Sequence, residues 1–330
     1  MKPRAILRHG LLAAVVGLGL AGPVRAADVT IRFSTAAPPA DFLAKALETF
    51  KAEAERTAPD VKVESYPASV LFRQGTEVPA LQRGNLEMST MTTFEVAQQM
   101  PEYGVFNRAY LFRDYPHLRQ VFDGPIGDDY KRKVADKMEI EILAVAYLGT
   151  RQVNLRNKRD VKGPADLAGV KMRMPAGPEW LLLGKTLGVS PVPLGMPEVY
   201  LALKTGTIDG QENPLTIMNA AKFYEVTEQV VLTAHMVQPV FFDIARTFWR
   251  KLSPQQQAAV AAAARVAAKS NDEARLADEA SVTEALKARG LTVATPDVAQ
   301  FRTLAEKVYA DSDLAKQWDP ALTKLVMETR

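Results

Sequence analysis

The spacing of hydrophobic residues changes repeatedly along the chain between a period near two, typical of strands, and a period near 3.6, typical of amphipathic helices. Strand patterns cover residues 29–34, 61–64, 86–91, 140–148, 170–174 and 189–193. Helical patterns begin near residue 40 and recur at 74–82, 116–122, 127–137, 179–187, 197–205 and after Pro214. Because strands and helices alternate, the sequence predicts mixed α/β sheets.

One helical pattern is much longer than the others. The Ala-rich segment 254–289 predicts an almost unbroken helix, longer than is usual in globular proteins. A chain of 330 residues favours two lobes over a single core. We therefore expect this helix to span both lobes. The alternative is an ordinary helix that breaks near Ser270 and Asn271.

The N-terminus has the pattern of a secretory signal peptide. Basic residues up to Arg8 precede an apolar core at 11–20, and small residues at Val24 and Ala26 flank a cleavage site. The apolar run is shorter than the ~20 residues of a membrane-spanning helix. The chain contains no Cys, so neither a lipoprotein anchor nor a disulfide is expected. We predict a signal peptide at 1–26 and a soluble periplasmic protein without a direct membrane anchor.

Charge adds little to this picture. The net charge of +3 comes from the four basic side chains of the predicted signal peptide, and the rest of the chain is nearly neutral. No basic run is present, so no nucleic-acid or anionic-membrane partner is expected.

Motifs of catalysis and cofactor binding are missing from the sequence. The only G-x-G-x-x-G pattern, at 17–22, lies inside the predicted signal peptide and follows no strand. With His9, His117 and His235 as the only histidines, no zinc triad can form. No G-x-S-x-G sequence occurs. We expect no cofactor, no metal and no enzymatic activity.

Several linked segments carry a family resemblance. Residues 197–214 read PEVYLALKTGTIDGQENP, and the pattern G-x-K-x-R-x-P occupies 169–175. Further blocks follow in the same order at 149–152, 187–193, 222–226 and His235. Together these segments resemble the substrate-binding subunits of TRAP transporters, the DctP family. The resemblance covers essentially the whole chain after the predicted signal peptide.

The resemblance implies a two-lobed periplasmic-binding-protein fold, type II-like, which closes about a hinge onto its ligand. Lobe I would comprise 27–148 plus about 238–270, and lobe II 149–237 plus about 271–330. The implied function is capture of a small organic acid (a hydroxy, keto or sugar acid) and delivery to the integral membrane permease subunits of a TRAP transporter. A monomer is the family expectation.

Three polar residues are implied as ligand contacts. Arg173 matches the Arg that binds the ligand carboxylate with two hydrogen bonds, Arg151 a second Arg near it, and Asn213 a polar contact. A planar guanidinium suits a carboxylate better than a Lys does, and a strand fixes its direction. Arg156 and Arg159 are alternatives to Arg151, and Asn213 has a second reading as a cap of the helix after Pro214.

Other positions depart from the family pattern. Met196 stands where an aromatic residue is common, and Arg108 either adds a cation to the cleft or lies in a solvated loop. Thr92 occupies a stretch where sialic-acid binders have ligand-contacting Glu and Arg, which argues against sialic acid. His235 and Trp180 are expected in the core. Further lining of lobe I is predicted at Phe33, Thr35 and Phe72.

Three other functions remain open on the sequence. One is a ligand-presenting partner of a sensor kinase, which would bind the ligand but be dispensable for uptake. The binding protein of an ATP-driven transporter would have similar lobes but should lack the 206–214 block. A periplasmic enzyme acting on organic acids would need an acid/base pair in the cleft.

Overall fold

A computed structural model describes residues 29–330. The predicted signal peptide at 1–26 lies outside the described residues. In the described part of the chain, no helix is long and apolar enough to cross a membrane.

The described strands form one nine-stranded mixed sheet. The path through the sheet is β2-β1-β3-β8-β4-β7-β5-β6, and β9 pairs with β8. The strands are β1 (Val29–Ser34), β2 (Val61–Tyr66), β3 (Met88–Met91), β4 (Ile140–Leu155), β5 (Lys171–Met174), β6 (Ser190–Pro193), β7 (Gly210–Pro214), β8 (Gln229–Ala245) and β9 (Thr292–Ala294).

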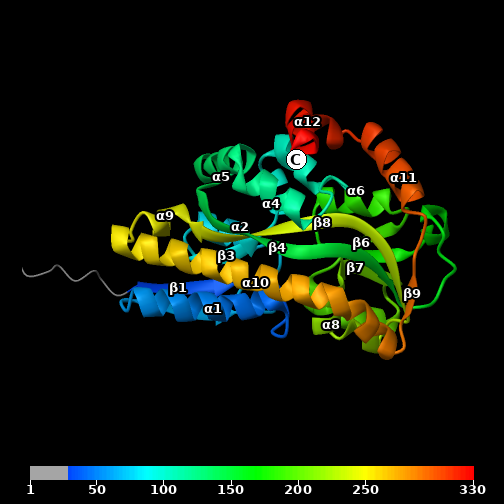
Figure 1. The fold of residues 1–330 in the computed structure, drawn as a ribbon, viewed down its shortest axis with the longest axis horizontal. Coiled ribbons are helices and arrows are strands. Elements are labelled where there is room, and N and C mark those ends of the chain that lie inside the picture. Colours follow the sequence, from blue (N-terminus) through cyan, green and yellow to red (C-terminus); the bar gives the residue numbers. More distant parts are fainter. Residues whose placement is uncertain (1–28) are drawn as a thin grey trace, which may run out of the picture.

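Helices cover both faces of this sheet (Figure 1). The α-helices are α1 (Phe42–Thr57), α2 (Glu77–Gln82), α3 (Thr93–Ala97), α4 (Tyr115–Asp123), α5 (Pro125–Met138), α6 (Pro178–Thr186), α7 (Val199–Thr205), α8 (Leu215–Ala220), α9 (Arg246–Trp249), α10 (Pro254–Ala288), α11 (Val298–Ala310) and α12 (Pro320–Glu328). Short 3₁₀ helices include η1 (Pro101–Asn107) and η3 (Met196–Glu198). The predicted mixed α/β fold is confirmed.

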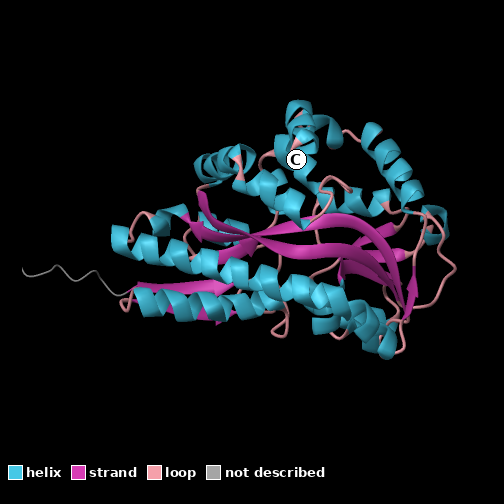
Figure 2. Cartoon of the chain, viewed as in Figure 1, coloured by secondary structure: helices cyan, strands magenta, loops and turns pink. Residues whose placement is uncertain are grey.

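Two long antiparallel strands, β4 and β8, connect the two halves of the sheet (Figure 2). The end of β8 pairs with β3, whereas the end of β4 pairs with β7. Their mutual register shifts between Tyr147 and Gly149. Gly149 has φ +124, and a Cβ there would lie 2.5 Å from Cβ of Pro214. Only glycine suits this register shift, which we call the crossover of β4 and β8 and which lies beside the cavity described below.

The long helix α10 is continuous, so the alternative of a break near Ser270 is wrong. It packs against α1, α8 and β4 and runs along most of the molecule (Figure 1). Asn271 Nδ2 donates to the carbonyl of Tyr147 at 2.8 Å, and Asp272 Oδ1 accepts from the Tyr147 amide at 2.7 Å. The helix is thereby attached to β4 next to the crossover.

The C-terminal segment contacts both halves of the sheet. Helix α11 packs against α6, whereas α12 packs against η1. His117 Nε2 on α4 lies 2.9 Å from the carbonyl oxygen of Val326 on α12, which fixes the end of the chain there. The last helix of the segment 271–330, which the resemblance assigns to lobe II, therefore lies on elements of 27–148, and the lobe boundaries stay a prediction.

Candidate ligand-binding cavity

A cavity lies between the two halves of the sheet, next to the crossover of β4 and β8. One wall comes from the N-terminal segments and includes Thr35, Gln74, Glu77, Thr90, Thr92 and Glu95. The opposite wall includes Arg151, Arg173, Trp180, Met196, Asn213 and Ile217. Gln238 and Val240 of β8 lie between them. Of the nine predicted contacts, six line this cavity: Arg173, Arg151, Asn213, Met196, Thr92 and Thr35.

Arg173 on β5 is buried without an acidic partner. Its side chain is 1% exposed. Nε donates to the carbonyl of Leu194 at 2.7 Å, and Nη2 donates to Oε1 of Gln74 at 2.9 Å. Among the described residues no carboxylate lies within 4.0 Å of it. Burial lowers the pKa of the guanidinium to about 9, with smaller influences from Glu212 and Arg151. The site thus holds a cation that the chain leaves unneutralised.

Lys171, two residues earlier on the same strand, is exposed, although alternation places it on the same face. Arg173 alone of the two reaches the cavity.

Arg151 differs from Arg173 in having an acidic partner. Its Nε donates to Glu212 Oε2 at 2.5 Å, and its Nη1 donates to Gln238 Oε1 at 2.6 Å. His235 Nε2 lies 3.0 Å from the same carboxylate oxygen. Burial opposes ionisation of Glu212, but Arg151 and His235 together lower the pKa of its carboxyl. Burial lowers the pKa of His235. This network holds Arg151 against the cavity with its charge already compensated.

Asn213 belongs to the polar strand β7 and not to a helix cap. Its Oδ1 accepts from Arg151 Nη2 at 3.1 Å, and its Nδ2 donates to Gln211 Oε1 at 2.6 Å. Helix α8 has no side-chain cap hydrogen bond. The capping alternative for Asn213 is therefore wrong. The neighbouring Gln238 is fully buried, and its Nε2 has no hydrogen-bond partner among the described residues.

Trp180 lies both in the core and on the cavity. Its ring stacks on Phe94 with centroids 3.5 Å apart, and the guanidinium carbon of Arg151 lies 4.9 Å from its centroid. From the sequence, Trp180 is expected in the core rather than at a ligand contact. The 3.6-residue spacing of α6 shows which side is buried but not that the buried side also faces a cavity.

Gln74 joins the two walls. Besides accepting from Arg173, its Oε1 accepts from the backbone amide of Met196 at 2.8 Å. The neighbouring Arg73 lies 3.5 Å from Glu198 at the rim. A single side chain from the N-terminal wall therefore contacts both β5 and η3, which places the two walls in a closed arrangement.

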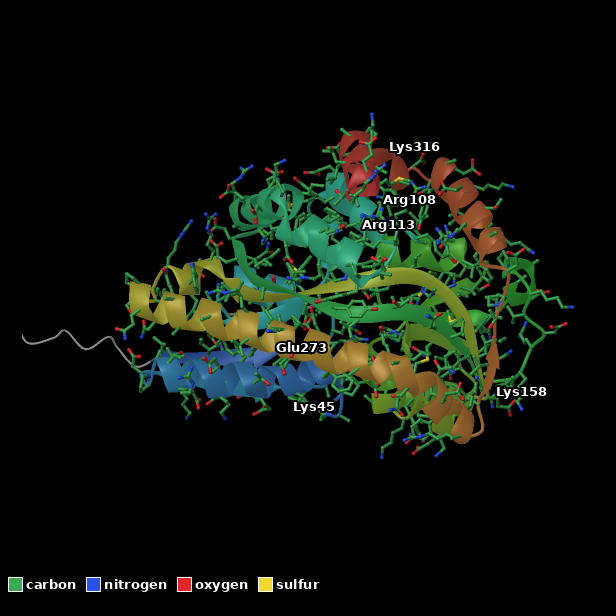
Figure 3. The ribbon with its side chains drawn as sticks, in the orientation of Figure 1. Lys45, Arg108, Arg113, Lys158, Glu273 and Lys316 are labelled. Carbon is green, nitrogen blue, oxygen red and sulfur yellow. The ribbon has the colours of Figure 1, made fainter. Side chains whose placement is uncertain are left out.

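Three predicted contacts do not line the cavity. Phe33 is fully buried in the core, edge-to-face with Phe50 and Phe242. Phe72 is partly buried and packs against the core. Arg108 pairs with Glu306 at 2.5 Å and lies near the C-terminal helices, on the far side of the sheet from α10 (Figure 3). The sequence offered two alternatives for Arg108, a cation in the cleft or an arginine in a solvated loop. Neither alternative included this ion pair with Glu306.

Sequence reasoning missed Gln74, Glu77 and Gln238 as lining residues. Gln74 and Glu77 lie at the start of a predicted helix, where polar residues are ordinary, and Gln238 interrupts an apolar strand. Only the interruption was a usable signal, because a Gln inside a buried strand needs a polar partner. Within residues 29–330 no group of three or more His, Cys, Asp or Glu side chains is placed to hold a metal ion.

The cavity, the two halves of the sheet and the crossing strands define the class: a two-lobed α/β binding protein that encloses a small ligand. A family model described as bacterial extracellular solute-binding protein, family 7 (DctP) matches residues 33–315. The chain therefore belongs to this family, as the sequence resemblance predicted.

Similarity to individual proteins supports this family assignment. The chain is 34% identical to a solute-binding protein of Verminephrobacter eiseniae over 90% of this chain and 88% of the relative. A TRAP periplasmic solute-binding protein of Roseobacter denitrificans with bound 3-deoxy-D-manno-oct-2-ulosonic acid is 38% identical, with TM-score 0.88 over 92% of this chain and all of the other. A second one from that organism, with bound L-galactonate, is 27% identical, with TM-score 0.84 over 91% and 99%.

Proposed function

We propose that the protein is an extracytoplasmic receptor that captures a sugar acid, or a related hydroxy or keto acid, and delivers it to a TRAP-type membrane permease. The observation that carries this proposal is Arg173, a buried cation at a cavity without a carboxylate of its own. A charge withdrawn from water is costly unless it is paired. The carboxylate of a ligand would supply the missing partner.

The surroundings of Arg173 suit one carboxylate. Its guanidinium can bind two oxygens in parallel, which fixes the orientation of the acid as well as its charge. The unpartnered Nε2 of Gln238 adds a neutral donor to the same cavity. Arg151 forms an ion pair with Glu212, so it contributes to the shape and the electrostatic field of the cavity but offers little unpaired charge.

The relatives narrow the ligand class. The two Roseobacter denitrificans proteins were obtained with an eight-carbon keto sugar acid and with an aldonate, respectively. Both molecules combine one carboxylate with several hydroxyls. The cavity of this chain offers polar groups for such hydroxyls at Thr35, Thr90 and Thr92.

Binding would be coupled to closure of the lobes. The lobe boundaries that we propose fall near residues 148–149 and 237–238, where the register of β4 and β8 shifts and Gly149 takes a left-handed conformation. A ligand held by both walls favours the closed form by its differential affinity for closed over open. The contacts of Gln74 with Arg173 and Met196 belong to that closed form.

The remaining parts of the proposal follow from the family. The family match disfavours the ATP-driven alternative. We infer secretion to the periplasm by a cleaved signal peptide, action as a monomer and release of the ligand unchanged. Ligand recovered chemically altered after incubation with the purified protein would favour the enzyme alternative.

The test is calorimetry on the purified protein with a panel of organic acids, guided by a thermal-shift screen. We expect at least one sugar acid to bind, and Arg173→Ala to weaken its binding by about 2–5 kcal/mol, the range for loss of one partner of a buried charge pair. Arg173→Lys should recover little, because an ammonium lacks the planar fork. Arg108→Ala is the matched control and should leave the affinity unchanged.

Two outcomes would contradict the proposal. One is a complete absence of stabilisation by any carboxylate in the panel. The other is a tight carboxylate ligand whose affinity is the same for the native protein and for Arg173→Ala.

A further inference from the structure

We propose that Glu77 and Glu95 form an acidic subsite in the cavity, which accepts hydrogen bonds from ligand hydroxyls and excludes a second carboxylate. The inference rests on the proposed function and assigns it a narrower substrate class, the polyhydroxy monocarboxylic acids. Dicarboxylic acids of the same length would be rejected.

Glu77 is the first residue of α2 and is 7% exposed. Its Oε2 accepts from the backbone amide of Gly75 at 2.7 Å, and this contact fixes the carboxyl on the wall formed by the N-terminal segments. Gly75, with φ +90, closes the turn beneath it. The side chain therefore lines the cavity in a defined orientation.

Glu95 is fixed by a second backbone element. It is the third residue of α3, and its Oε2 accepts from the Thr92 amide at 2.8 Å and from the Thr92 hydroxyl at 2.5 Å. These contacts complete a capping box. In both carboxyls the short hydrogen bonds go to Oε2, which leaves Oε1 as the acceptor for a ligand.

Neither carboxyl is neutralised by the protein. Within the described chain no Lys, Arg or His lies within ion-pair distance of Glu77 or Glu95, whereas Glu212, next to Arg151, has both Arg151 and His235. The cavity is thus polarised. One wall presents the unpaired cation Arg173, and the other presents two unpaired acidic groups.

This polarity selects ligands by their two ends. A carboxylate at one end satisfies Arg173. Hydroxyls at the other end can donate to carboxylate oxygens, which accept hydrogen bonds only. A second carboxylate would face two acidic groups, and such like-charge contacts are strongly unfavourable where water is excluded.

The electrostatic state of the pair agrees with this assignment. Burial raises the pKa of Glu77 to about 7, with a further contribution from Glu95, and burial likewise raises the pKa of Glu95. The donors of Gly75 and Thr92 therefore do not offset the cost of burying the ionised carboxyls in the unliganded cavity. Hydroxyls of a ligand would supply further donors.

The experiment compares three dicarboxylates with their monocarboxylate counterparts by calorimetry at pH 8: D-glucarate with D-gluconate, galactarate with D-galactonate, and meso-tartrate with D-erythronate. 3-deoxy-D-manno-oct-2-ulosonic acid is included as a further monoacid. In the native protein, each dicarboxylate should bind at least about 100-fold more weakly than the best monoacid. In Glu77→Gln/Glu95→Gln, the best monoacid should lose about tenfold or more in affinity, and the gap to the dicarboxylates should narrow.

Glu179→Gln is the matched control. Glu179 is 3% exposed and burial raises the pKa of its carboxyl to about 7, but it does not line the cavity. Its replacement should leave both affinities unchanged. Glutamine keeps an acceptor oxygen at positions 77 and 95, so the turn and the capping box can persist, and a near-native melting temperature verifies this.

The outcomes separate this inference from the proposed function. If no monoacid binds the native protein, the proposed function fails. If monoacids bind but a dicarboxylate binds within tenfold of the best one, or the double variant leaves monoacid affinity unchanged, only the subsite is overturned. Tighter binding of 6-amino-6-deoxy-D-gluconate than of D-gluconate would also overturn it, because the pair would then be an ammonium site.

Discussion

Arg275 and Arg173 are both large side chains that are fully buried, but their surroundings differ. Arg275, on α10, donates to both carboxylate oxygens of Asp41, at 2.7 and 3.3 Å, and to Thr216 Oγ1 at 2.5 Å. Asp41 also caps α1 through the Leu43 amide. Arg173 has only the neutral acceptors of Leu194 and Gln74.

The difference separates two uses of a buried cation. At Arg275 the chain supplies the counter-ion, and the pair connects α1, α8 and α10 on the side of the molecule remote from α11 and α12 (Figure 1). At Arg173 the chain supplies none, and a cavity adjoins the side chain. A buried arginine with an internal carboxylate is part of the scaffold. A buried arginine without an internal carboxylate has a charge available for a ligand.

The largest expected effect concerns the scaffold arginine. Arg275→Met leaves Asp41 buried and without its cation, and breaking a buried pair in this way costs about 3–5 kcal/mol. Urea unfolding of the unliganded protein should therefore show a loss of that size. Ligand affinity of the folded protein should change little, because Arg275 does not line the cavity.

The double variant Arg275→Met/Asp41→Asn is the control for this explanation. Asparagine can still cap α1 but carries no charge. Part of the lost stability should return. A double variant as unstable as Arg275→Met alone would mean that altered packing, and not the unpaired carboxylate of Asp41, accounts for the loss of stability.

A second, smaller effect tests whether Glu77 is an ion partner of Arg173. Such a partner would have a lowered pKa, whereas burial raises the pKa of Glu77 to about 7 from a usual 4.5. The folded protein then binds more protons than the unfolded chain between these values. The contribution of Glu77 to stability is therefore complete below about pH 4.5 and declines as the pH rises towards 7, by at most about 1.4 kcal/mol per unit.

The measurement is the stability difference between the unliganded native protein and Glu77→Gln at pH 4.5, 5.5, 6.5 and 7.5. Because other buried carboxyls are common to both proteins, the difference isolates residue 77. It should shift in favour of Glu77→Gln as the pH rises. A shift of the opposite sign would place Glu77 in an ion pair. Arg173 would then have an acidic partner, as Arg275 does.

The sequence predicted many of the elements with strong hydrophobic periodicity, but it missed β8, although that strand is largely apolar. Strand β1 was predicted with its observed bounds because Ile31 and Phe33 alternate with exposed or half-buried residues, and α10 was predicted within one residue of its end. The prediction missed β7. Its Gln211, Glu212 and Asn213 are polar yet buried, so no hydrophobic pattern marks the strand.

Most of the cavity-lining residues that were predicted came from motifs of the family, and Thr35 is an exception. Arg173, Arg151 and Asn213 came from the family resemblance, and all three line the cavity. Phe33 was assigned to the lining although its alternation on β1 places it equally well in the core. Nothing local could distinguish Arg275 from a surface arginine, because its partner Asp41 is 234 residues away in the chain.

The smallest expected effect is the most discriminating. In unliganded Arg173→Met, the loss of two hydrogen bonds to neutral acceptors is offset by removal of an unpaired buried charge, so stability should stay within about 1 kcal/mol of the native value. Methionine fills similar space with a flexible apolar chain. Urea unfolding without ligand is the measurement, with Arg275→Met measured in parallel.

Adding ligand should then separate the native protein from Arg173→Met. At a hundredfold excess over its Kd, the ligand stabilises the native protein by about 2.7 kcal/mol, and the same concentration should leave Arg173→Met nearly unchanged. If unliganded Arg173→Met instead lost as much stability as Arg275→Met, Arg173 would belong to the scaffold, and the absence of a carboxylate beside it would need another explanation. A site maintained for binding, in contrast, need not stabilise the empty protein, because its interactions are completed only by the ligand.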